Sequence, residues 1–287
     1  NGRLKIVSTI FPSYDFARAI AGENADITIL LSPGVESHSY EPTPQDMIQI
    51  QNCDLFLYTG GESDTWVDDL LSSLEQPINT VKMMDCVDVY EEEILEGMQA
   101  EDSSHAHEVE YDEHVWLSLD NAQLFVKSIT ENLCAIDSEN AETYKANCEK
   151  YLSQLDALDD EYEEVIENSK YKTLIFADRF PFRYLTDDYD LSYYAAFKGC
   201  SAETEASFET ITFLANKADE LNLPRILTID GSDGKMAKTV VATSKNKNRM
   251  IYSLDSLQSV TDNEVQSGKT YIKAMESNLE ILKKALN

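Results

Sequence analysis

The stretch Ser138–Ser169, SENAETYKANCEKYLSQLDALDDEYEEVIENS, divides this chain of 287 residues into two parts. Its apolar residues recur at steps of three and four: Ala141, Tyr144, Cys148, Tyr151, Leu155, Leu158, Tyr162 and Val165. This spacing predicts one amphipathic helix, roughly 45 Å long at a rise of about 1.5 Å per residue. We expect the helix to link two lobes and to allow less opening than a flexible hinge.

Apolar runs that are typical of strands alternate with helical patterns on both sides of this helix. Before it, the expected strands are Leu4–Ser8, Asp26–Leu31, Leu55–Tyr58 and Thr80–Met84, and the expected helices are Tyr14–Ile20, Pro44–Gln51 and Trp66–Leu74. After it, the expected strands are Lys172–Ala177, Tyr193–Phe197, Arg225–Ile229 and Met250–Leu254, with helices Phe208–Leu221 and Glu264–Leu286. Strands and helices in turn indicate parallel sheets with covered faces.

We therefore predict an α/β fold of two lobes, each with a mostly parallel sheet flanked by helices, joined by one long backbone helix. The N-terminal lobe covers 1–137, the linking helix 138–169 and the C-terminal lobe 170–287.

The charge of the chain narrows its partners. It carries 53 acidic and 23 basic residues, a formal net charge of -30. This negative field repels nucleic acid and concentrates cations, so we expect no nucleic-acid partner. No apolar run reaches the roughly 18 to 20 residues that cross a bilayer. Since Asn1–Lys5 shows no signal-peptide pattern, we expect any signal or anchor segment to be absent from this chain.

The five cysteines show neither a CxxC pair nor the spacing of a structural zinc site, so we do not expect cysteine to lead the chemistry. Cys134 and Cys148 lie on either side of a predicted helix-to-helix turn. They are interpreted either as a disulfide or as two thiols that face the core.

An acidic loop is predicted at about 91–113, within Met83–Val126, a stretch without Lys or Arg. We expect it to be mobile from Glu96 to Glu110, because so charged a segment does not bury itself at low cost. It is either a solvated charge run or a loop that collects cations, and His105 and His107 favour the second interpretation.

Two histidine segments suggest a metal site. Gly34–Asp46, GVESHSYEPTPQD, contains His38 and follows a predicted strand, while Asp112–Leu119, DEHVWLSL, contains His114. Imidazole with carboxylates suits zinc, and manganese as the share of oxygen ligands rises. A lone histidine after a strand is more often a packing residue, but two histidines beside aromatics favour metal binding. Tyr40 and Trp116 either shield the site or simply pack.

In open α/β sheets, ligands bind beyond the carboxyl ends of the strands. The polar residues that follow the predicted strands are His38, Asp178, Asp230 and Asp255. We expect imidazole and carboxylate groups from both lobes to meet in the cleft between them.

The two histidine segments resemble the extracytoplasmic solute-binding proteins of ABC importers for zinc and manganese, a lipoprotein family with a His-x-Tyr-Glu-Pro segment and a later His-x-Trp segment. The likeness includes KIVSTIFPSYDFARAIAG, NCDLFLYTGG, NAETYKANCEKYLSQL and YSLDSL. It implies that His38 and His114 are the first two metal ligands and Asp255 a carboxylate ligand from the second lobe. It also implies a monomer, not an enzyme, that is periplasmic or lipid-anchored at the cell surface and delivers Zn²⁺ to a membrane permease.

The third ligand departs from the family pattern, which places His or Glu just after the first strand of the second lobe. FADRFPF puts Ala177 in that register, so Asp178 is our substitute, with Glu203, Glu205 and Asp230 as further candidates. HAHEVEYDEH resembles a shortened form of the His-rich loop of zinc-specific members, which favours zinc over manganese.

Three alternatives remain at this point: a Mn²⁺-binding protein of the same kind, a metal-dependent hydrolase and a surface adhesin. A hydrolase would use an open coordination position to activate water. The chain contains no HExxH motif, and GSDGK at 231–235 is interpreted as a helix-start turn and not as a phosphate loop.

Overall fold

The computed structural model describes residues 2–31, 35, 37–99 and 109–287. The chain forms two compact units, and each is described by itself. The first unit contains 1–89, 118–158 and 257–273, and the second contains 90–117, 159–256 and 274–287.

The first unit is built on a parallel sheet with strand order β2-β1-β3-β4. The strands are β1 (Leu4–Ser8), β2 (Ala25–Ile29), β3 (Leu55–Tyr58) and β4 (Asn79–Lys82). β3 is buried along its whole length, as expected for a strand covered on both faces. The four strands predicted for this part of the chain are confirmed, with ends shifted by one or two residues.

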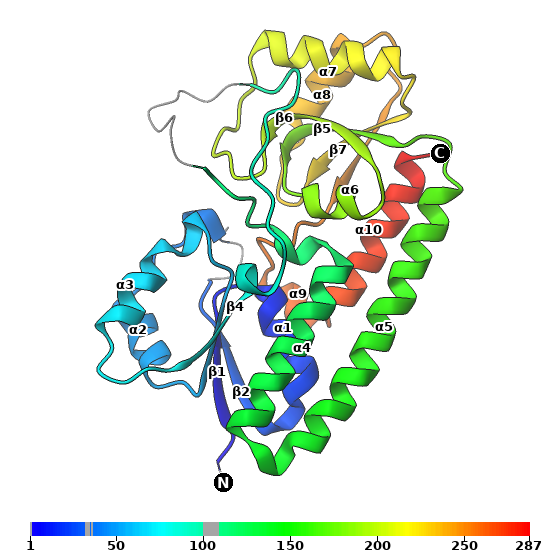
Figure 1. Ribbon diagram of the computed structural model, residues 1–287. Coiled ribbons are helices and arrows are strands. Elements are labelled where there is room, and N and C mark those ends of the chain that lie inside the picture. The colour runs from blue at the N-terminus through cyan, green and yellow to red at the C-terminus, as the bar shows by residue number, and fades with distance from the viewer. Residues whose placement is uncertain (1, 32–34, 36, 100–108) are drawn as a thin grey trace. The chain divides into compact units, whose positions relative to one another are not determined.

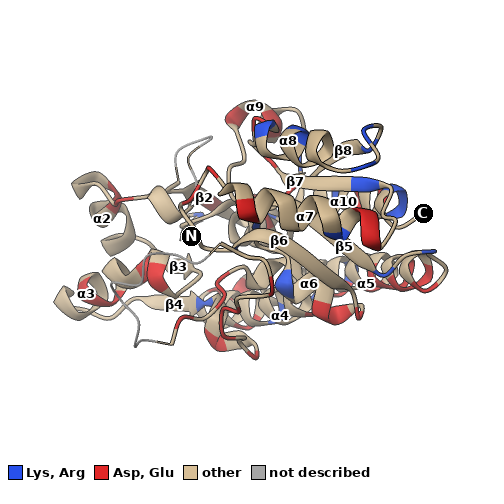
Figure 2. Cartoon of the chain, turned by 90° about the horizontal axis from the view of Figure 1, so that it is seen from above, with Lys and Arg blue, Asp and Glu red and all other residues tan. Residues whose placement is uncertain are grey.

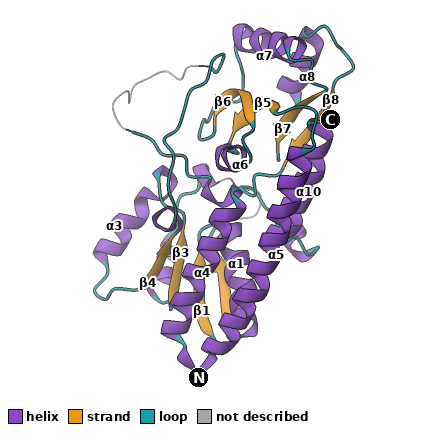
Figure 3. Cartoon of the chain, turned by 45° about the vertical axis from the view of Figure 1, so that its right-hand side comes forward, coloured by secondary structure: helices purple, strands orange, loops and turns teal. Residues whose placement is uncertain are grey.

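Helices cover this sheet (Figures 1 and 3). They are α1 (Phe11–Ala21), α2 (Pro44–Gln51), α3 (Thr65–Ser73) and α4 (Leu119–Ile136). Ile50 of α2 and Val67 of α3 pack with Phe56 of β3 in one core cluster. Phe16 of α1 packs against Phe125 of α4, with ring centroids 6.3 Å apart.

The second unit has a parallel sheet with strand order β6-β5-β7-β8. Its strands are β5 (Thr173–Phe180), β6 (Ser192–Lys198), β7 (Arg225–Ile229) and β8 (Met250–Leu254). Its helices include the short α6 (Arg183–Asp188) and the longer α7 (Phe208–Glu220) and α8 (Lys235–Thr243). Ile175 and Ala177 of β5 pack with Leu214 of α7 and Val240 of α8. The predicted helix-start turn at 231–235 is confirmed, because Gly234 is the N-cap of α8.

The long linking helix is also confirmed. After a short 3₁₀ turn at Ser138–Asn140, α5 runs from Ala141 to Glu167. Tyr144, Leu155 and Tyr162 on its apolar face are fully buried. Its residues up to Leu158 belong to the first unit and those from Asp159 to the second.

The predicted helix Glu264–Leu286 is wrong as a single element. The structure has α9 (Asp262–Gln266) and α10 (Tyr271–Ala285) instead. Gly268 lies between them at a φ of 88°, a left-handed conformation that ends a helix and that glycine adopts at little cost.

The described residues of 90–117 lie in the second unit, whereas we predicted an N-terminal lobe that runs to residue 137. Three hydrogen bonds hold this segment there: Tyr90 N to the Tyr184 hydroxyl (3.1 Å), the same hydroxyl to the Asp112 carbonyl (2.6 Å), and Gln99 N to the Ala196 carbonyl (2.9 Å). The described ends of the acidic loop are therefore attached to the second unit. His105 and His107 lie outside the described residues.

All five cysteines are free thiols, so the disulfide interpretation for Cys134 and Cys148 is wrong. Among the described residues, no helix is long and apolar enough to cross a membrane. Five of the 23 basic residues lie in α8 or the turn before β8, and the others are spread over the chain, as are the acidic residues (Figure 2).

Candidate metal site

His38 lies in a 3₁₀ turn of the first unit, Ser37–Ser39. Its Nδ1 is 2.8 Å from the Ser63 hydroxyl. Ser63 is held in place by its neighbour Asp64, whose carboxylate accepts the backbone N–H groups of Thr59 and Gly60 at 2.9 Å each. The loop after β3 thus fixes one ring nitrogen of His38, and in the neutral tautomer that donates from Nδ1 the lone pair for a metal is on Nε2.

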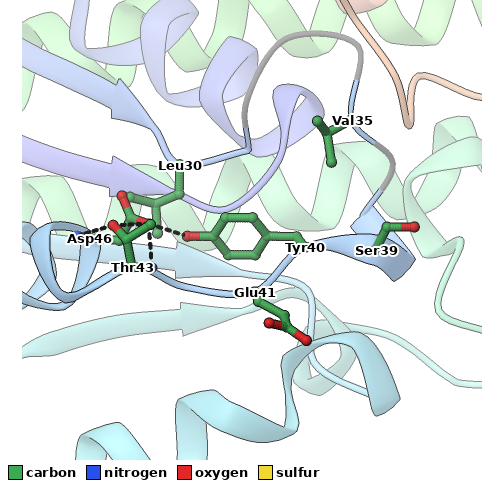
Figure 4. Close-up of a pocket in the computed structure, with 7 residues that line it drawn as sticks. All are labelled: Leu30, Val35, Ser39, Tyr40, Glu41, Thr43 and Asp46. Carbon is green, nitrogen blue, oxygen red and sulfur yellow. Dashed lines mark hydrogen bonds between the residues drawn. The ribbon is translucent and has the colours of Figure 1, made fainter.

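The segment after His38 is anchored to α2. Thr43 and Asp46 form a capping box at the start of this helix, with Pro44 in its first turn. The Tyr40 hydroxyl donates to the same Asp46 carboxylate at 2.9 Å. Figure 4 shows the Tyr40 ring crossing a pocket of about 370 Å³ toward Asp46. Tyr40 therefore anchors the backbone beside His38, and its predicted shielding role stays a prediction.

In the second unit, a short antiparallel pairing brings the acidic segment next to His114. Glu91 and Tyr111 form a β-bridge. Glu92 N donates to the Glu110 carbonyl, and Asp112 N donates to the Tyr90 carbonyl, both at 2.8 Å. Residues 90–92 and 110–112 are thus side by side, which places Glu92 near Asp112 although they are far apart in sequence.

Asp112 orients the His114 ring. One Asp112 carboxylate oxygen accepts from the backbone N–H of His114 at 2.9 Å and lies 2.7 Å from its Nδ1. Both side chains are buried, with 1% of Asp112 and none of His114 exposed. A carboxylate on one ring nitrogen is the arrangement that orients metal-binding histidines, and it leaves Nε2 for the metal. Burial lowers the pKa of His114, but the charge and hydrogen bond of Asp112 outweigh it and leave this pKa raised.

Trp116 packs beside this histidine, as one of the two sequence interpretations proposed. The rings of His114 and Trp116 meet edge to face with centroids 5.5 Å apart. The Trp116 indole donates to the Ser256 carbonyl at 2.9 Å. Ser256 is held in turn by Asp230, whose carboxylate accepts from its N–H (2.7 Å) and its hydroxyl (2.6 Å). Asp230 therefore supports the wall of the site, and its carboxylate is engaged in that role.

Glu92 and Cys200 complete the surroundings of His114. Possible ligand atoms of Glu92, Asp112 and His114 lie within 4.8 Å of one another, and so do those of His114 and Cys200. Burial raises the pKa of Cys200 well above its usual value, with the charge of Glu92 adding to the effect. Burial likewise raises the pKa of Glu92, helped by the nearby Asp112 charge. Cys200 is therefore adjacent to the candidate ligand His114, although we did not expect cysteine to lead the chemistry.

Gly199 makes room for the His114 ring. A Cβ at this position would lie 2.8 Å from the Phe180 carbonyl oxygen and 3.1 Å from Cε1 of His114. Only a residue without a side chain fits between the backbone of β5 and the imidazole.

The structure places Ala177 and Asp178 differently from the sequence expectation. Ala177 is buried in the core with α7 and α8. Asp178 lies inside β5 and not after it, at an irregularity in the pairing with β6 between Phe176 and Arg179. Its two carboxylate oxygens accept the N–H groups of Arg179 (2.9 Å) and Ile229 (3.2 Å). The carboxylate thus accepts a backbone N–H at the end of β7 and one from its own strand.

The remaining candidates divide into one at a strand end and two at the surface. Asp255 directly follows β8, and its backbone is tied to the Asn278 side chain by two hydrogen bonds of 2.8 and 2.9 Å. Glu203 and Glu205 are exposed in the segment before α7. The exposure of Glu203 and Glu205 fits the interpretation that they are acidic charges near the start of a helix.

Two parallel α/β units, a long helix through both and a histidine beside a buried carboxylate define a two-unit α/β protein with a candidate metal site. The family model of zinc-uptake complex component A, periplasmic, matches residues 6–285. The chain belongs to this family.

The chain is similar to zinc-binding lipoprotein AdcA of Streptococcus pneumoniae, with 32% identity over 99% of this chain and 56% of that protein. It thus spans about half the length of this relative. It is also 32% identical to the high-affinity zinc uptake system protein ZnuA of Bacillus subtilis, over 99% of this chain and 88% of that one.

Solved structures agree with this family assignment. The Zn(II)-bound ZnuA-like domain of S. pneumoniae AdcA superposes with a TM-score of 0.81 at 28% identity, covering 99% of both chains. The metal-dependent lipoprotein YcdH of B. subtilis gives a TM-score of 0.83 at 29% identity, covering 99% of this chain and all of that one.

Proposed function

We propose that this protein captures a divalent transition-metal ion outside the cytoplasm and delivers it to the permease of an ABC importer. Zn²⁺ is the proposed cargo. The observation that carries the proposal is the Asp112–His114 pair, a buried imidazole oriented by a carboxylate. The names of the relatives support zinc as the cargo.

In this proposal His38 and His114 are ligands of the captured ion. Asp255 supplies a carboxylate, and Asp178 remains the sequence-derived proposal for the second one. The protein acts as a monomeric binding protein, anchored by lipid or periplasmic, and not as an enzyme. Steady turnover of phosphoester, peptide or amide substrates by the zinc-loaded protein would favour the hydrolase alternative instead.

Metal binding tests the proposal directly. Zinc at 100 times its dissociation constant adds about 2.7 kcal/mol to the free energy of unfolding, so the melting temperature should rise clearly. His38→Ala and His114→Ala should each lose the tightly bound equivalent in equilibrium dialysis. His105→Ala and His107→Ala are matched controls and should retain it, because we assign that segment to capture and not to the main site. Full binding by both ligand variants would place the site elsewhere.

Delivery needs a separate test in cells. A strain that lacks the protein should accumulate less radioactive zinc at low external zinc, and the intact gene should restore uptake. Restoration by the His114→Ala form to the same level would contradict the proposed role of this histidine in transport.

A further inference from the structure

The second unit lacks a ligand where the sequence looked for one. Ala177 points into the core, and both oxygens of Asp178 are engaged by backbone N–H groups. The groups that do approach His114 are Glu92 and Cys200. Both come from other segments: Glu92 from the pairing with 110–112, and Cys200 from the turn just after β6.

We propose that Cys200 binds the captured ion as a thiolate beside His114, and that Glu92 supplies the adjoining carboxylate oxygen. This inference rests on the proposed function and adds two donors from the second unit to those proposed there. Asp112 is then a positioning residue that acts through His114.

The distances fit this donor set. Zinc at its usual bond lengths to sulfur and imidazole nitrogen holds the two atoms about 3.6 Å apart in tetrahedral geometry. The ligand atoms of His114 and Cys200 lie within 4.8 Å of each other without a metal. A shift of about 1 Å, within the reach of side-chain rotation, closes the remaining gap.

An unsatisfied atom points to the same place. Glu92 Oε1 is buried and has no hydrogen-bond partner. An unpaired buried acceptor costs about 1–3 kcal/mol, more when it is charged, and a cation at this position removes the cost. Two other observations agree: Glu92 hydrogen-bonds to Cys200, and Gly199 keeps the space beside the imidazole open.

The charges are complementary as well. The Cys200 thiolate and the Glu92 carboxylate bring two negative charges to the zinc ion, and His114 binds as neutral imidazole. As the zinc–sulfur bond forms, the S–H bond breaks and its proton passes to the buffer, with no change of oxidation state. A thiolate is a soft ligand that favours zinc over manganese, so Cys200 would set the metal preference.

The test uses cadmium and cobalt as spectroscopic probes. A thiolate bound to either ion gives a charge-transfer absorption in the ultraviolet, at longer wavelength for cobalt than for cadmium. The wild-type protein with one equivalent of Cd²⁺ or Co²⁺ should show this band, and Cys200→Ser should lose it. Cys148→Ser, at a buried cysteine in α5, is the control and should keep it.

Zinc affinity from chelator competition gives the second readout. Cys200→Ser should bind zinc at least roughly 100-fold more weakly, since even loss of an outer-shell partner costs about 10–100-fold. Its manganese affinity should change much less. Glu92→Gln should also weaken zinc binding, whereas Glu91→Gln, an exposed neighbour, should not.

The outcomes separate the two proposals. If the wild type binds one equivalent of metal without a thiolate band, or if Cys200→Ser binds zinc as tightly, the cysteine assignment is overturned while the proposed function stands. If the wild type binds no metal at all, the proposed function itself fails. The wild-type spectrum alone decides the matter should Cys200→Ser not fold.

Discussion

Replacing Asp112 by Asn tests whether the buried carboxylate tunes His114 for metal binding. Asn is nearly the same size and keeps the carbonyl oxygen that accepts from the backbone and the ring of His114. The substitution therefore removes the charge and leaves the geometry. Asp120→Asn, at an exposed position at the start of α4, is the matched control.

The magnitude follows from the contact. A hydrogen bond to a charged group contributes about 1.5–3 kcal/mol, and 1.4 kcal/mol corresponds to about tenfold in affinity. At 2.7 Å and with both side chains buried, the Asp112–His114 contact belongs in that range. We expect Asp112→Asn to weaken zinc binding about 10–100-fold near neutral pH, in agreement with the effect of outer-shell partners of metal-binding histidines.

The pH dependence has a definite sign. The pKa of His114 is raised in the wild type, so protons compete with zinc at a higher pH than for an ordinary histidine. Without the Asp112 charge, the pKa of His114 should fall, because burial opposes the charged imidazole. The difference in affinity between wild type and variant should therefore narrow as the pH falls.

Chelator competition across pH and NMR titration of the His114 imidazole in the metal-free protein measure both quantities. Equal zinc affinity in the two proteins, or a difference that widens on acidification, would refute the reasoning.

Two further predictions concern stability. Gly199→Ala forces a Cβ to within 2.8 Å of the Phe180 carbonyl and 3.1 Å of the His114 ring. Denaturant titration should therefore show a loss of about 1–3 kcal/mol in the free energy of unfolding, and zinc binding should weaken. An unchanged free energy of unfolding and zinc affinity would mean that the close approach is absent. Burial raises the pKa of Glu264, but Lys269 and the helix cap outweigh it and bring it from 4.5 to about 2. A carboxylate with a lowered pKa stabilises the fold above its unfolded pKa, so this contribution should be lost between about pH 4.5 and 2. Glu264→Gln should remove that part of the pH dependence, and an identical acid-unfolding profile would contradict the assignment.

Periodicity made the elements predictable. The long run of apolar residues at three- and four-residue steps defines α5 because one face of a helix must be buried over its whole length. The strands were located for a similar reason, since both faces of a parallel sheet are covered and their residues form short apolar runs. The break between α9 and α10 was missed because the positive φ of Gly268 depends on how the chain turns, which apolar spacing does not record.

The surroundings of His114 were harder to predict. Sequence reasoning gave His114 and its neighbour Trp116, because these lie in one short segment. Glu92 and Cys200 approach the ring from segments about 20 and 90 residues away, through pairings that form only in the folded unit. Cysteine was set aside on spacing alone, but spacing rules apply only when the ligands come from one or two local motifs. The one available signal was Gly199-Cys200 directly after a predicted strand, where ligands of α/β proteins lie.

The composition of this site also explains why an empty form and a loaded form should differ in stability. Asp112 and Glu113 are almost fully buried, and Glu92 lies close to Asp112. Burying like charges together is unfavourable unless cations compensate them, and Lys198 and a protonated His114 each supply one positive charge near Glu92. A divalent ion bound to His114 and Cys200 would add two more. Burial and these neighbouring negative charges raise the pKa values of Glu92 and Cys200. The same charges that make the empty site less stable provide the attraction that captures the metal.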